Sequence, residues 1–200
     1  MTVSTMLSLL SEGFVTSLLI FALTLLFSMP LGLAVMFGRR SRLTPLRGFI
    51  KAYISIMRGT PLMLQLMVVF YGPKLLLGVT VPGNWRFTAV IVAFVINYAA
   101  YFAEIYRGGI ESIPRGQYEA AQVLGYTKAQ TFFKIILPQM VKRVIPAVTN
   151  EVITLVKDTS LARIISIMEL TKVGESYIKA QGITSVSYTH LRAHETLSDL

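Results

Sequence analysis

Long apolar runs alternate with short basic segments along this chain. Residues 14–37 carry no charged side chain, and neither do residues 87–103. Because a helix rises about 1.5 Å per residue, roughly 20 apolar residues are enough to cross the ~30 Å hydrocarbon core of a bilayer. The pattern therefore predicts a transmembrane helix over each of these two runs.

Two further apolar stretches are interrupted by polar residues. Residues 52–77 contain the tripeptide Gly59-Thr60-Pro61. Proline removes a backbone donor and disfavours helix in the residue before it, so we expect this span to kink or restart there. Residues 144–168 include several charged side chains, and the apolar part at 144–156 is too short to cross alone. We expect an interruption near residues 157–160, with Thr159 or Ser160 capping the next helical piece.

Composition agrees with a membrane protein. The chain is 54% hydrophobic and 14% charged, against about 25% charged in an ordinary soluble domain. The net charge of +9 comes from basic residues gathered at the ends of the apolar runs, and no nucleic-acid-binding motif accompanies them. The basic cluster after residue 37 favours the cytoplasm, which predicts an N-terminus outside the cell. With no cysteine in the sequence, thiol and disulfide chemistry are excluded.

Residues 107–143 form a polar, basic island that the same rule places in the cytoplasm. Within it we expect a short helix over residues 116–124, with Glu119 in its first turn and Gly125 in the left-handed conformation that ends it. Thr127 and Gln130 have capping-box spacing, which predicts the start of a second helix that stops at residues 137–138. We call this helix–turn–helix, residues 116–138, the elbow, and expect it to lie across the cytoplasmic surface.

Several polar residues fall at or near membrane depth. Asn97, Tyr101 and Glu104 lie three to four residues apart and so share one helical face. This stripe either packs against neighbouring helices or lines a solute path, because buried polar groups in a bundle are costly and often functional. The same two interpretations apply to the other candidates for a translocation path, namely Asn150, Glu151, Lys157 and Asp158.

Four motifs resemble one family. Glu119-Ala120-Ala121, with Gly125, Ile135, Leu137 and Pro138 at the spacing seen here, is similar to the EAA loop in permease subunits of ABC importers. Three others resemble the polar amino acid branch of that family: Arg58-Gly59-Thr60-Pro61-Leu62 with Gln65, Glu104-Ile105-Tyr106-Arg107-Gly108-Gly109-Ile110, and Lys157-Asp158-Thr159-Ser160-Leu161. The similarity extends from about residue 12 to about residue 182. It implies an all-α membrane protein with the helical bundle of a type I ABC importer permease.

The resemblance also implies a mechanism and partners. The elbow would be the coupling helix that docks on a cytoplasmic ATPase dimer, through Glu119, Ala120, Ala121, Gly125, Ile135, Leu137 and Pro138. The sequence contains no GxxxxGK[ST] phosphate loop. We therefore expect that the chain is not an enzyme and binds no cofactor. The partner ATPase would bind and hydrolyse ATP. A second permease subunit, identical or related, and an extracytoplasmic amino acid-binding protein would complete a multi-pass importer in a bacterial cytoplasmic membrane.

Other classes of protein fit the sequence less well. An intramembrane enzyme would need a catalytic motif, but neither HExxH nor GxSxG is present. A secondary transporter would need inverted repeats, which are not visible, and it would leave the EAA-like loop unexplained. A membrane-anchored scaffold could use the elbow simply to hold a partner. A permease for another small solute remains an alternative.

The last stretch departs from the family pattern. Residues 186–200 are polar and cannot cross a bilayer, where the family continues into a last span. We therefore expect a permease domain over residues 1–185, with about four spans where five are usual. We expect residues 186–200 to be a truncated or chimeric end, with a native soluble tail as the alternative.

Overall fold

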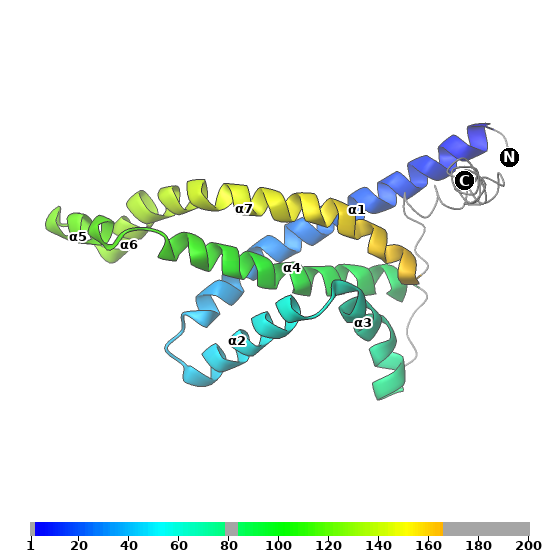
Figure 1. The fold of residues 1–200 in the computed structure, drawn as a ribbon, viewed down its shortest axis with the longest axis horizontal. Coiled ribbons are helices and arrows are strands. Elements are labelled where there is room, and N and C mark those ends of the chain that lie inside the picture. Colours follow the sequence, from blue (N-terminus) through cyan, green and yellow to red (C-terminus); the bar gives the residue numbers. More distant parts are fainter. Residues whose placement is uncertain (1–2, 79–83, 166–200) are drawn as a thin grey trace, which may run out of the picture. The chain divides into compact units, whose positions relative to one another are not determined.

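A computed structural model of the chain describes residues 3–78 and 84–165, and every regular element within these residues is helical (Figure 1). The chain divides into two compact units. One is Ile20–Asp158, which contains most of the described helices. The described part of the other holds the first turns of α1 and the 3-10 segment η2, Thr159–Ile165. The polar stretch 186–200 lies outside the described residues.

The two uninterrupted apolar runs are confirmed as long helices. Residues 14–37 lie in α1 (Val3–Arg39), and residues 87–103 lie in α4 (Trp85–Glu111). Both helices are long and apolar enough to cross a membrane. The described residues thus hold two candidate spans, or three with the bent pair below, against the four that we expected. The fourth apolar stretch falls in α7 (Leu137–Asp158), whose apolar residues are interrupted by charged ones.

The break at Thr60-Pro61 is also confirmed. Helix α2 (Thr44–Gly59) ends there and α3 (Leu62–Leu77) begins directly afterwards. The two helices are bent by 111° with respect to one another. Helix α2 starts several residues before the apolar stretch does, because Pro45 fits the first turn of a helix and residues 44–51 continue the same amphipathic pattern.

Helix α4 is the centre of unit Ile20–Asp158 and packs against α2, α3 and α7. Its aromatic side chains Phe94, Tyr98 and Phe102 are fully buried. Helix α1 also approaches α4 closely, since a Cβ atom on Gly32 would lie only 2.8 Å from the Cβ atom of Phe102. Small residues at such crossings let helix backbones pack tightly in a membrane.

The elbow is built largely as its local signals predict. Helix α5 spans Arg115–Val123. It is terminated by Gly125, which has a φ of 74°. Hydrogen bonds from the N–H of Gly125 to the carbonyl of Gln122 and from Tyr126 to Ala121, both 3.0 Å, form a Schellman motif. Thr127 and Gln130 then form the predicted capping box at the start of α6 (Lys128–Gln130).

Two details of the elbow prediction are wrong. Glu119 lies beyond the first turn of α5, because the helix begins earlier, at Arg115 behind Pro114. The second helix does not stop at Pro138 but runs through the π-helical segment η1 (Thr131–Ile136) into α7. The N–H of Leu137 reaches back to the carbonyl of Phe132 in this wider turn. Pro138 directly follows this wider turn, and there neither its ring nor its missing N–H breaks the helix.

The predicted interruption near residues 157–160 is confirmed, since α7 ends at Asp158 and the 3-10 segment η2 follows. The remainder of the apolar stretch 144–168 beyond Ile165 lies outside the described residues.

Candidate functional site

The outer face of α5 exposes an acid together with apolar side chains. Glu119 and Ala120 are exposed, and so are Val123 (88%) and Leu124 (71%). The spacing of these residues places them on one side of the helix. We call Glu119, Ala120, Val123 and Leu124 the elbow surface. Apolar residues gathered at an exposed site with polar neighbours are typical of a surface that binds another protein.

The other residues expected to couple to an ATPase have different positions. Ala121 is fully buried inside the chain, so its side chain faces away from the elbow surface. Gly125 shapes the turn, Ile135 and Leu137 are half-buried, and Pro138 is exposed at the passage into α7. Val123 and Leu124 were not among the residues predicted from the sequence. They follow Glu119 and Ala120 by four residues each, and this spacing indicates that they lie on the same helical face.

Polar contacts fasten the elbow to the longer helices. The Gln139 side chain on α7 donates a 3.1 Å hydrogen bond to the side chain of Gln117 on α5. The Arg143 guanidinium, also on α7, donates to the carbonyl of Ser112 at the end of α4. The first contact ties α5 to α7, and the second ties α7 to the end of α4.

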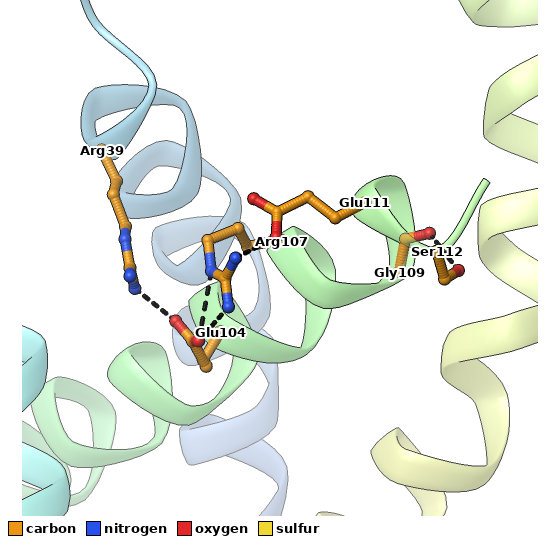
Figure 2. A network of polar contacts seen from close by, with 6 residues as sticks. All are labelled: Arg39, Glu104, Arg107, Gly109, Glu111 and Ser112. Atoms are coloured by element: carbon orange, nitrogen blue, oxygen red, sulfur yellow. Dashed lines mark hydrogen bonds and ion pairs between the residues drawn. The ribbon is translucent and has the colours of Figure 1, made fainter. Parts of the chain in front are cut away.

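An ionic network ties the end of α1 to α4 (Figure 2). Glu104 on α4 accepts from Arg39 at the end of α1 and from Arg107 one turn further along α4. Arg107 also pairs with Glu111. The Arg39, Glu104 and Arg107 side chains are about a quarter exposed, so water screens these pairs only in part. The network was not evident from sequence, because Arg39 and Glu104 are 65 positions apart.

Glu104 also borders a polar cavity of about 470 Å³. The cavity lies beside α1, α2 and α4, and its charged lining consists of Glu104 with three cations, Arg39, Lys51 and Arg58. The Arg58 guanidinium stands over the ring of Tyr101, 5.4 Å from its centre. One acid, paired with Arg39 and Arg107, thus lies beside several cations at the same cavity.

Asn97 lies in the protein interior and does not face this cavity. It is 4% exposed and donates to the Gln65 side chain at 2.9 Å and to the Met57 carbonyl at 3.2 Å. The Gln65 amide in turn donates to the carbonyls of Met57 and Thr60. These side chains satisfy backbone groups that the break between α2 and α3 leaves without helical partners. Asn97 therefore stabilises the break.

The path candidates on α7 are not among the described residues that line the cavity beside Glu104. Asn150 and Lys157 are exposed, and Glu151 is half-buried. Asp158 accepts a 2.7 Å hydrogen bond from the hydroxyl of Tyr98 on α4. Within residues 3–78 and 84–165, no group of three or more His, Cys, Asp or Glu side chains could hold a metal ion.

Comparison with known proteins adds independent information. Residues 28–181 match the family described as binding-protein-dependent transport system inner membrane component. The L-cystine transport system permease protein TcyB of Bacillus subtilis is 37% identical over 185 residues, which are 92% of this chain and 76% of that protein. The arginine transport system permease protein ArtQ of the same bacterium is 36% identical over 161 residues, or 80% and 72% of the two chains.

Solved structures agree with these relatives. A crystal structure of an amino acid ABC transporter with histidines has a TM-score of 0.77 at 33% identity, covering 94% of this chain and 86% of that one. An inward-facing structure of the MetNI methionine ABC transporter has a TM-score of 0.66 at 22% identity, covering 98% and 92%. This second likeness concerns the fold alone.

Proposed function

Because this chain belongs to the family of binding-protein-dependent transport system inner membrane components, we propose that it carries a polar amino acid across the cytoplasmic membrane of a bacterium. It is a permease subunit of an ABC importer, with the all-α fold of type I permeases. Relatives named for the transport of cystine, arginine and glutamine support this substrate class.

The proposed mechanism rests on the exposure of the elbow surface. Val123 and Leu124 are apolar, highly exposed and on the same side of α5 as Glu119. We propose that this surface docks on a cytoplasmic ATPase subunit, where the apolar pair is buried and Glu119 accepts from basic or backbone donors. Buried Ala121 and left-handed Gly125 would hold the elbow in shape, and residues 135–138 would pass its motion to α7.

In this proposal ATP is bound and hydrolysed only by the partner. Closure of an ATPase dimer moves the elbows of two permease subunits, identical or related, and the spans tilt between outward- and inward-open states. An extracytoplasmic binding protein delivers the amino acid. The chain would lie with its N-terminus outside.

The proposed solute path runs past Glu104. This carboxylate lies beside three cations at a polar cavity, which suits the opposite charges of an amino acid zwitterion. Asn150, Glu151, Lys157 and Asp158 remain proposed path residues on α7. Asn97 acts indirectly, since it positions α2 and α3.

Uptake by proteoliposomes tests the function. The complete transporter, with its ATPase, permease and binding-protein subunits, is reconstituted, and uptake of radiolabelled amino acids is measured with and without ATP. We expect uptake of a polar amino acid that requires both ATP and the binding protein. Uptake that persists without the ATPase would refute the ATP-driven mechanism, and ATP-dependent uptake restricted to other solutes would refute the substrate class.

A charge reversal tests the elbow surface in the same assay. Glu119→Lys should reduce uptake at least tenfold while the permease still inserts into the membrane. The matched control is Glu12→Lys, which reverses an exposed acid on α1 and should leave uptake within about twofold. Equal uptake by both variants would contradict the docking proposal.

A further inference from the structure

A second cavity lies between the elbow and the end of α1. Its volume is about 630 Å³, and α1, α4, α5, α6 and η1 all contribute side chains to it. It shares no residue with the elbow surface or with the polar cavity beside Glu104. Neither ATPase docking nor the proposed solute path therefore accounts for it.

The chemistry of this cavity suits an anion with an apolar neighbour. Arg40 and Lys128 are the charged residues among the described residues that line it, and none of these is a carboxylate. The hydroxyl of Tyr118 adds a neutral donor, whereas Phe37 and Phe132 supply apolar wall. Cations next to hydroxyl donors are typical of phosphate binding, but a site for free phosphate has no need of apolar walls.

The position of the cavity indicates where the anion comes from. Phe37 is 56% exposed in the last turns of α1, a helix long enough to cross the membrane, and Arg40 directly follows the end of that helix. A residue at such a place lies where the hydrocarbon ends and lipid headgroups begin. Basic pockets at the cytoplasmic ends of spans bind anionic lipid headgroups.

We propose that this cavity binds one anionic phospholipid, such as phosphatidylglycerol. Arg40 and Lys128 pair with the phosphate, Tyr118 donates to it, and Phe37 contacts the glycerol end of the acyl chains. Because Arg40 belongs to the end of α1 and Lys128 to the elbow, the bound lipid connects the moving elbow to a span. Transport then depends on anionic lipid at this site.

Lipid retention tests the proposal. The complete transporter is purified from nanodiscs that contain equal amounts of phosphatidylglycerol and phosphatidylcholine, and native mass spectrometry counts each retained lipid. We expect preferential retention of phosphatidylglycerol. The double variant Arg40→Gln/Lys128→Gln should lose this retention by roughly 10- to 30-fold, since each cation near a membrane surface contributes about a factor of five.

The matched control removes two other exposed cations, in Arg42→Gln/Lys142→Gln, that do not line the cavity. It should keep most of the retention, and both variants should unfold at the wild-type temperature because all four side chains are exposed. Equal loss in both variants would show attraction to surface charge in general and overturn the site. Unchanged retention in Arg40→Gln/Lys128→Gln would overturn it as well.

Competition distinguishes lipid from a free anion. Glycerol 3-phosphate and inorganic phosphate are added to the loaded transporter at millimolar concentration. We expect neither to displace the lipid, because they lack the acyl chains that contact Phe37. Displacement by either would overturn the lipid assignment in favour of a soluble phosphate. Uptake assays in pure phosphatidylcholine should show slower transport by the wild type, while a failure of the proposed function would abolish uptake in every lipid.

Discussion

Two adjacent glycines on α4 offer a matched pair of substitutions. A Cβ atom at Gly109 would lie 3.2 Å from Cγ of Met140 and closer still to a methyl group of Val144, both on α7. At Gly108, one position earlier on the same helix, a Cβ atom would meet nothing within 4 Å. Alanine at either position therefore has the same local effect on α4. Only the substitution at Gly109 adds an atom that collides with α7.

Two opposing effects determine how each substitution changes the free energy of unfolding. Alanine in place of glycine stabilises a helix by up to about 1 kcal/mol. Overpacking costs about 1–3 kcal/mol, and the stiff χ1 of valine leaves Val144 little freedom to move aside. Gly108→Ala should therefore be stabilising by up to about 1 kcal/mol. Gly109→Ala should be less stable than Gly108→Ala by about 1–3 kcal/mol.

Thermal unfolding of the purified transporter in nanodiscs measures this difference. For a chain of this size, 1 kcal/mol corresponds to a shift of about 2–4 °C, so the two variants should differ by about 2–12 °C. The double variant Gly109→Ala/Val144→Ala removes the opposing methyl groups and should recover part of the loss. Equal melting temperatures for Gly108→Ala and Gly109→Ala would refute the close packing of α4 on α7.

Three further experiments test other parts of the molecule. Asn97→Leu removes hydrogen bonds at the break between α2 and α3 and should lower stability by about 1–3 kcal/mol, measured by thermal unfolding. Glu104→Gln leaves two arginines without their shared acid and should slow uptake more than Glu111→Gln, which loses a pair within α4 alone. Leu7→Cys should react with an impermeant maleimide in intact cells, whereas Val123→Cys should react only after the cells are opened.

An Asn97→Leu variant as stable as the wild type would mean that Asn97 does not support the break. Identical uptake by Glu104→Gln and Glu111→Gln would remove the argument for a tie between α1 and α4. Labelling of Val123→Cys in intact cells would reverse the predicted topology.

Features that depend on near neighbours in sequence were predictable. The charge-free runs at 14–37 and 87–103 required only length and hydropathy. The turn at Gly125 and the cap formed by Thr127 and Gln130 depend on residues within five positions of one another. Local chemistry is sufficient to specify such elements.

Features that depend on distant partners were not predictable. Asn97 was expected to line a path or pack against neighbours, and only the fold shows that Gln65, from 32 positions away, meets it. Ala120 and Ala121 are identical in sequence terms, yet one is exposed and the other fully buried. The sequence predicts a helix end at Pro138, because the preceding π-helical turn leaves no recognisable sequence signal.

Cross-linking tests whether the elbow surface contacts the ATPase subunit. The chain has no native cysteine, so Val123→Cys, at a site 88% exposed, introduces a single thiol that can carry a photoactivated cross-linker. Leu75→Cys, at a site 77% exposed at the far end of α3, is the control. After illumination of the assembled transporter, we predict a covalent adduct with the ATPase subunit from Val123→Cys and none from Leu75→Cys. An ATPase adduct at Leu75→Cys with none at Val123→Cys would contradict docking through the elbow surface.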